Sequence, residues 1–126
     1  MQNPADFSRI PRLDSQEALR RCMGKPDFAE ELAGIFVNET LPMYLPGLEE
    51  GFEKKEFAMV ARNAHGIKGG SAAIGLMRAR KMAYALEMAG RKEDMDMIVQ
   101  LMPLLREELD QVTRMIKEQG LLDGET

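Results

Sequence analysis

Apolar residues recur every three or four positions through most of this chain, a spacing that places them on one face of a helix. The clearest such stripe has spacings of 3-4-4-3-4 and comprises Ile98, Leu101, Leu105, Leu109, Val112 and Ile116. A second stripe, with spacings of 3-4-3-4-3, comprises Phe57, Val60, Ala64, Ile67, Ser71 and Ile74. No segment alternates as a half-buried strand does. The pattern therefore predicts an all-α protein.

Local signals divide this pattern into separate helices. Two acidic pairs of the kind that cap helix N-termini, Asp14 with Glu17 and Asp27 with Glu30, open the first two helices. The first is short. The second should run on to about Phe52, although two prolines within it must kink or interrupt it.

Three further helices are expected over residues 56–74, 76–89 and 93–119, with Gly75 and Gly90 ending the first two of them. Short breaks between long helices favour antiparallel neighbours. The expected fold is an antiparallel four-helix bundle with a short additional N-terminal helix.

Length and composition agree with one domain. The chain has 126 residues, of which 44% are hydrophobic, enough for a single core. We expect an N-terminal extension over 1–13, the bundle over 14–119 and a flexible tail over 120–126. A single cysteine, Cys22, cannot form an internal disulfide and indicates a reduced, cytoplasmic protein. The amino terminus lacks the apolar run of a signal peptide, and no segment approaches membrane-spanning length.

His65 is the only histidine, and it lies about 130° from the centre of its helix's apolar stripe, so it should face solvent. Small residues surround it: Ala61 and Gly69 stand four positions either side, and Ala72 occupies the next turn. With Gly66 and Gly70, three glycines sit within one helix at a cost of about 2–3 kcal/mol. We interpret them as clearance for a bulky group or a partner's backbone.

Lys68 follows His65 by three residues, so its ammonium can reach the space over the imidazole. A fixed cation beside a nucleophilic nitrogen suits phosphoryl transfer, in which negative charge spreads over the equatorial oxygens. A solvated surface lysine is the alternative interpretation.

The run from Ala64 to Gly75 reads Ala-His-Gly-Ile-Lys-Gly-Gly-Ser-Ala-Ala-Ile-Gly. It resembles the signature of histidine-containing phosphotransfer (HPt) domains: Ala-His, any residue, Leu or Ile, Lys-Gly, two small residues, and a glycine four positions later. The resemblance implies a helical bundle whose histidine accepts a phosphoryl group from the aspartyl phosphate of a response-regulator receiver domain and passes it on. It makes His65 the phosphoacceptor, Lys68 its electrostatic neighbour, and Gly69 the residue that leaves room for the phosphoryl oxygens.

The resemblance continues into the next helix, where Glu87 stands twenty-two residues after His65. Several family members place a Glu or Gln there that hydrogen-bonds the imidazole. Such a carboxylate would orient the ring and leave its other nitrogen free to attack. A solvated helix residue is the alternative. Arg91 matches a later basic position of the pattern less specifically.

Charge is unevenly distributed, although the chain as a whole carries −4. Between Arg62 and Lys92 there are seven basic residues and one acid, Glu87. A locally basic surface around His65 could attract an acidic partner, such as the aspartate cluster of a receiver domain. Two helices whose basic faces simply point into solvent would show the same number of basic residues. Nucleic acid is a poor candidate partner, because the sequence pI is about 5.1 and no binding motif is present.

One histidine and one cysteine cannot form a zinc site, and no aspartate cluster flanks His65, so no metal ligands are expected in this chain. Any magnesium should come from the partner's receiver domain. The expected function is a phosphoryl carrier rather than an enzyme, with receiver domains or a hybrid sensor histidine kinase as partners. Two alternatives stay open: the phosphoacceptor domain of a chemotaxis-type histidine kinase, and a non-catalytic helical adaptor.

Overall fold

A computed structural model describes residues 5–124 as a set of helices joined by short connections. The helices are α1 (Ser15–Arg21), α2 (Pro26–Ile35), the π-helical segment η1 (Phe36–Thr40), α3 (Leu41–Glu53), α4 (Phe57–Ala73), α5 (Met77–Arg91) and α6 (Met95–Gln119). The described residues contain no strand, which confirms the all-α prediction.

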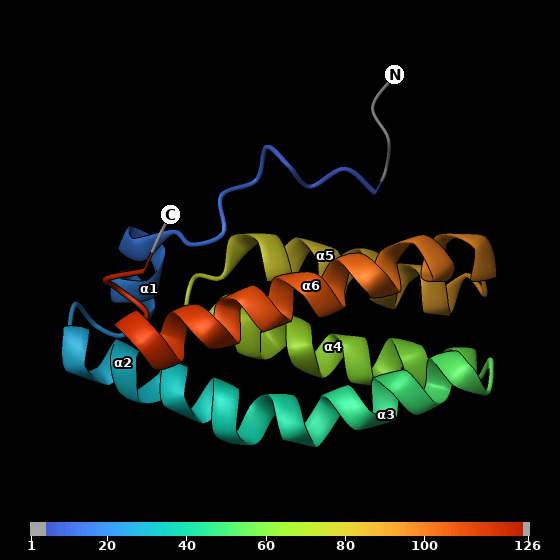
Figure 1. Cartoon of the computed structure of the whole chain (residues 1–126), viewed down its shortest axis with the longest axis horizontal. Coiled ribbons are helices and arrows are strands. Elements are labelled where there is room, and N and C mark those ends of the chain that lie inside the picture. Colours follow the sequence, from blue (N-terminus) through green and yellow to red (C-terminus); the bar gives the residue numbers. More distant parts are fainter. Residues whose placement is uncertain (1–4, 125–126) are drawn as a thin grey trace.

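Four long rods form the bundle. The first rod is α2, η1 and α3 in unbroken succession, and α4, α5 and α6 then alternate in direction, as Figure 1 shows. The short helix α1 lies at one end of the bundle. The architecture is the expected antiparallel four-helix bundle with an additional N-terminal helix.

The apolar stripes face the core as their spacing predicts. In α6, Ile98, Leu101 and Val112 are fully buried, and in α4 the same is true of Ala64 and Ile67. Burial of these faces is the main source of stability for helices of this length.

The acidic pair predicted to cap the first helix does so, whereas the pair predicted to cap the second helix does not. The Asp14 side chain caps α1 by accepting a hydrogen bond from the Glu17 backbone N–H at 3.0 Å. The second acidic pair is not a cap, because α2 begins at Pro26, a residue that suits the first helical turn. The Glu30 carboxylate instead accepts hydrogen bonds from the backbone N–H groups of Leu121 and Leu122 at 2.7 and 2.9 Å.

The prolines do not break the second rod. The η1 segment has wider, π-type hydrogen bonding, in which the Leu41 N–H reaches back five residues to the Phe36 carbonyl. It ends just before Pro42, which has no N–H to donate and whose ring would crowd a regular preceding turn. The wider turn therefore lets the rod continue, and Pro46 is accommodated inside α3.

Gly75 ends its helix as predicted, whereas Gly90 does not. Gly75 follows α4 with a φ of 70°, a conformation that favours glycine. Gly90 lies inside α5, which continues to Arg91, and the prediction that it terminates the helix was wrong. A Cβ on Gly90 would lie 3.0 Å from the backbone N of Ala61 and the backbone O of Phe57, so this glycine permits close packing of α5 on α4.

The segments outside the helices are anchored to the bundle. In the expected N-terminal extension, Phe7 and Leu13 are buried, and the Arg12 guanidinium pairs with the buried Glu108 at 2.8 Å. In the expected tail, Leu121 is fully buried and its backbone N–H donates to the Glu30 carboxylate, while the flexibility of residues 120–126 stays a prediction. Residues 1–4 and 125–126 lie outside the described residues.

Candidate functional site around His65

His65 projects from the middle of α4 into solvent, with 62% of its side chain exposed. Its neighbours in sequence, Asn63, Ala64 and Ile67, are buried. The outward orientation predicted from the apolar stripe is therefore confirmed. An exposed imidazole can meet a reactive group on another protein without rearrangement of the bundle.

Glu87 of α5 holds the imidazole from below. Its carboxylate Oε2 lies 3.0 Å from His65 Nδ1, and its side chain is only 4% exposed. An ionised carboxylate can only accept, so Nδ1 carries the hydrogen and donates it. The opposite ring nitrogen, Nε2, then keeps a lone pair in the neutral ring. The structure thus brings together the two residues that the resemblance had linked.

Two cations share the same carboxylate. Lys68 Nζ forms an ion pair with Glu87 Oε1 at 2.8 Å, and Arg91 Nη2 donates to Oε2 at 2.8 Å. Lys68 also lies over the ring of Tyr84, with its ammonium 5.3 Å from the ring centroid, a cation–π contact. Lys68 is therefore directed at Glu87 and is linked to His65 through the two oxygens of that carboxylate.

These contacts set the charge state of the buried acid. Burial by itself raises the pKa of Glu87, but the contacts with Lys68, Arg91 and His65 together outweigh it and lower that pKa to about 2. Glu87 is consequently a carboxylate at all physiological pH values.

The three glycines of α4 serve different purposes. A Cβ on Gly66 would lie 2.4 Å from the Tyr44 ring of α3, and a Cβ on Gly70 would lie 2.7 Å from Thr40 Cγ2. These two glycines let α3 and η1 pack closely, which corrects their interpretation as clearance for a ligand. A Cβ on Gly69 would meet nothing within 4 Å. Only this position leaves open space beside His65.

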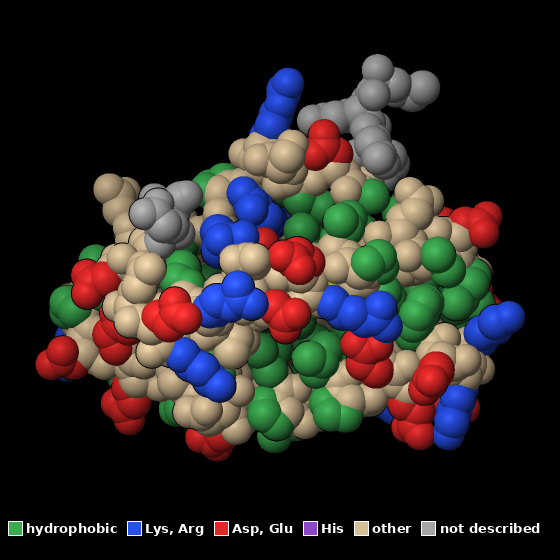
Figure 2. Space-filling model, viewed as in Figure 1, with side chains coloured by type: hydrophobic (Ala, Val, Ile, Leu, Met, Phe, Trp, Pro, Cys, Tyr) green, Lys and Arg blue, Asp and Glu red, His purple; other side chains and the backbone are tan. Residues whose placement is uncertain are grey.

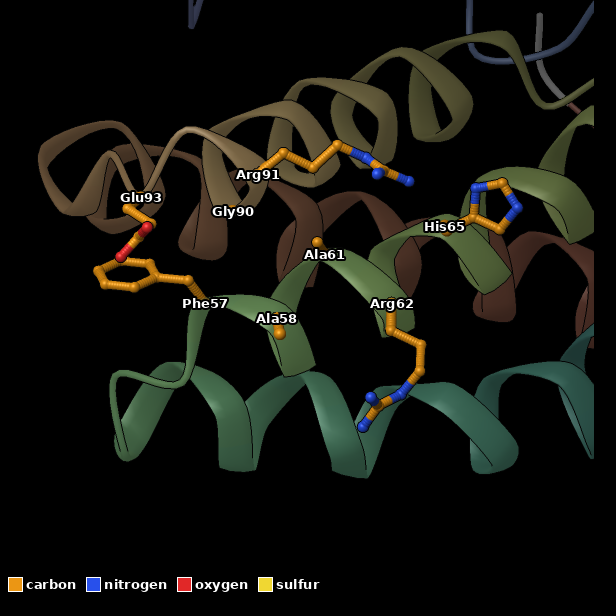
Figure 3. Close-up of a pocket in the computed structure, with 8 residues that line it drawn as sticks. All are labelled: Phe57, Ala58, Ala61, Arg62, His65, Gly90, Arg91 and Glu93. Carbon is orange, nitrogen blue, oxygen red and sulfur yellow. The ribbon is translucent and has the colours of Figure 1, made fainter.

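Two grooves lie along α4 near the imidazole: His65 lines the first, and the second begins at Lys68, three residues further on. The first runs from His65 toward the start of α4 and is floored by small residues between two arginines, as Figure 3 shows; its lining comprises Phe57, Ala58, Ala61, Arg62, His65, Gly90, Arg91 and Glu93. It contains the predicted residues Ala61, Arg62 and Arg91. The second groove runs the other way and contains the predicted Lys68, Gly69 and Ala72 together with Arg80, Lys81 and Tyr84.

Tyr84 was missed by sequence reasoning, although a signal for it existed. It precedes Glu87 by three residues and so falls on the same face of α5. Because Glu87 contacts His65, the three-residue spacing from Tyr84 to Glu87 brings Tyr84 next to Lys68, which follows His65 by three residues.

Within residues 5–124 no three His, Cys, Asp or Glu side chains are grouped closely enough to hold a metal ion. None of the helices described is long and apolar enough to cross a membrane.

Comparison with known proteins agrees with this geometry. The Hpt domain family matches residues 31–114, which include His65, Lys68, Glu87 and Arg91. The phosphorelay intermediate protein rdeA of Dictyostelium discoideum is 24% identical over 95 residues, which is 75% of this chain. The chain spans 37% of the length of that relative. No solved structure gives a significant match.

The match to the family covers more than half of the chain, and the bundle and the exposed histidine are in accord with it. The chain therefore belongs to the HPt domain family, the domains of histidine phosphotransfer.

Proposed function

We propose that this protein carries a phosphoryl group on His65 between receiver-domain aspartates in a two-component phosphorelay. One observation supports it above the others: an exposed imidazole whose Nδ1 is held by a buried carboxylate at 3.0 Å while its Nε2 remains available. A phosphoacceptor needs this combination of access, orientation and a free lone pair.

In the forward step, the lone pair of His65 Nε2 attacks the phosphorus of an aspartyl phosphate on the receiver. The N–P bond forms as the acyl phosphate P–O bond breaks, and the bonding electrons leave with the aspartate carboxylate. The ring, which still carries its Nδ1 hydrogen, becomes positively charged. Glu87 lies against that hydrogen and stabilises the charge. The reverse step returns the phosphoryl group to another aspartate.

Lys68 supplies the nearest side-chain cation for the phosphoryl oxygens. The Lys68 side chain is 26% exposed, and its ammonium contacts Glu87 in the unphosphorylated chain. Rotation about the bonds of this flexible side chain turns the ammonium from the carboxylate toward the incoming phosphoryl group. Gly69 leaves the approach open. Magnesium is assigned to the receiver, since phosphoryl transfer from its aspartate draws on a metal held there.

The protein is accordingly a carrier whose partner contributes most of the catalysis. The name of the Dictyostelium relative, a phosphorelay intermediate, supports this assignment. The partners proposed are receiver domains, either separate or part of a hybrid sensor histidine kinase.

The test is to mix the protein with a panel of receiver domains, each carrying a radiolabelled aspartyl phosphate. We expect at least one receiver to pass its label to the chain, as a species labile in acid and stable in base. His65→Gln should take up no label, whereas Lys117→Gln, an exposed change on α6, should match the wild type. Label on the His65→Gln protein, or no transfer from any receiver, contradicts the proposal.

A further inference from the structure

The basic groove, as we name the second groove beside His65, is lined by Lys68, Gly69, Ala72, Arg80, Lys81 and Tyr84. We propose that it is the docking site for an acidic segment of the receiver domain, next to the receiver's phosphorylated aspartate. This inference rests on the proposed function and names the partner surface that the function requires.

The position of the groove suits a partner engaged with His65. It begins at Lys68 and Gly69, one turn beyond the histidine on α4, and reaches Ala72. Seven residues of helix correspond to about 10 Å along the axis. A segment in the groove therefore lies within about two helical turns of the nitrogen that receives the phosphoryl group.

The charge of the groove is uncompensated. Lys68 is paired with Glu87, but neither Arg80 nor Lys81 forms an ion pair with any residue between 5 and 124. No acidic residue lines the groove. Elsewhere the basic residues of α5 are neutralised within the bundle: Arg78 lies 3.7 Å from Glu108, and Arg91 is held by Glu87. The two free cations thus stand together at one place.

Arg80 supplies a second, independent observation. Its Nε is buried and has no hydrogen-bond acceptor, and its Nη2 makes only a weak 4.0 Å contact with Met77 Sδ. A buried donor without an acceptor is destabilising, because it has lost its hydrogen bond to water without a replacement. A carboxylate entering the groove brings the guanidinium a strong acceptor, and Arg binds carboxylates in this paired geometry.

The groove also offers contact area. Tyr84 is 49% exposed although large, and the space over Gly69 is open. Tyrosine and arginine are among the residues that most often dominate the binding energy at protein interfaces.

The alternative surfaces fit an acidic partner less well. The first groove contains Glu93, and its Arg91 is already paired with Glu87. On the face that Figure 2 shows, acidic and basic side chains are interspersed over α6. The first groove is lined by His65 and has one cation without an ion pair among the described residues, Arg62, beside the acidic Glu93. The basic groove has two such cations, Arg80 and Lys81, no acidic lining residue, and begins three residues after His65 on α4.

The experiment compares three charge reversals in the full chain: Lys81→Glu in the basic groove, Arg62→Glu in the first groove and Lys117→Glu on α6. The donor is whichever phosphorylated receiver of the panel labels the wild-type chain fastest. For Lys81→Glu we expect kcat/KM to fall roughly tenfold at low ionic strength, mainly through KM, and the deficit to shrink as salt is added. Lys117→Glu should stay within about twofold of the wild type.

Two controls separate docking from chemistry. Phosphoramidate, a small donor that needs no docking surface, should label His65 equally in the wild type and in Lys81→Glu; failure to label the wild type counts against the proposed function instead. Amide chemical-shift changes on adding unphosphorylated receivers should include α5 residues 80–84 and disappear in Lys81→Glu. The inference is overturned if Lys81→Glu transfers like the wild type, if Arg62→Glu or Lys117→Glu is impaired as much, or if no receiver shifts those amides.

Discussion

His65 Nδ1 and Glu87 Oε2 lie 3.0 Å apart across the contact between α4 and α5, with the ring exposed and the carboxylate buried. This difference in burial gives the two residues different roles in the site. The buried Glu87 orients the imidazole, and the exposed His65 ring is accessible from solvent, as the proposed transfer requires. Lys68 and Arg91 complete the cluster by neutralising the carboxylate that would otherwise be buried with its charge unbalanced.

The first prediction concerns Glu87 and pH. The pKa of Glu87 falls to about 2 in the folded chain from an ordinary 4.5, so its contribution to stability is complete above pH 4.5 and is lost as the pH falls through 2. Glu87→Gln should lower the free energy of unfolding by about 2 kcal/mol near neutral pH, and the difference should shrink steadily below about pH 4.5. Urea unfolding at several pH values measures it. Glu49→Gln, which breaks an exposed pair with Arg106, should cost less than about 1 kcal/mol, and a Glu87→Gln cost that does not vary with pH would contradict the assignment.

The second prediction separates two neighbouring glycines of α4. Gly66→Ala places a Cβ 2.4 Å from the Tyr44 ring and should destabilise the chain by about 1–3 kcal/mol. Gly69→Ala has open space and gains helix propensity, so it should be neutral or stabilising by up to about 1 kcal/mol. For the rate of phosphotransfer we expect the opposite order of the two variants. Gly69→Ala should slow transfer from the receiver although it folds well. Thermal unfolding and transfer rates measured on the same samples test both expectations. Rapid transfer by Gly69→Ala would show that the open space at Gly69 is not needed for the phosphoryl group.

The third prediction concerns the packing of α5 on α4. Gly90→Ala brings a Cβ to 3.0 Å from two backbone atoms, which cannot move aside as a flexible side chain can. We expect a loss of about 1–3 kcal/mol. Gly34→Ala in α2, where a Cβ meets nothing within 4 Å, is the matched control and should stabilise by up to about 1 kcal/mol. Equal stabilities of the two variants would show that the helices do not approach as described.

The fourth prediction concerns the N-terminal extension. Glu108 is buried and binds Arg12 at 2.8 Å, while Arg78 donates to the Ile10 carbonyl at 2.8 Å. Glu108→Gln leaves Arg12 without its counter-charge and should cost about 2–4 kcal/mol. It should also expose residues 5–12 to limited proteolysis. Glu118→Gln, an exposed change near the end of α6, should change neither measurement, and an extension equally resistant in Glu108→Gln would show that the ion pair does not anchor it.

The sequence predicted those features that depend on residues close together in the chain. The orientation of His65 follows from the apolar stripe of a single helix, and the Asp14 cap from a pair three residues apart. The position of Glu87 beneath the ring was suggested by the family resemblance alone, because no local rule relates residues on different helices.

Packing between helices could not be predicted from the sequence, for a physical reason. A glycine that ends a helix and a glycine that admits a neighbouring backbone look alike in one dimension, so Gly90 was assigned the wrong role. The Asp27 and Glu30 pair shows the same limit, since Glu30 is engaged by the far end of the chain. The pairing of Lys68 with both Glu87 and Tyr84 likewise depends on the approach of α5.

The chemical centre is contained in one helical hairpin. His65, Lys68, Tyr84, Glu87 and Arg91 all belong to α4 and α5, which are joined by residues 74–76. Contacts at this sequence separation close smaller loops than contacts between the first rod and α6 do. The rods α2–α3 and α6 pack against that hairpin and contribute no side chain to the cluster, so substitutions on their solvent-facing sides should leave the geometry around His65 unchanged.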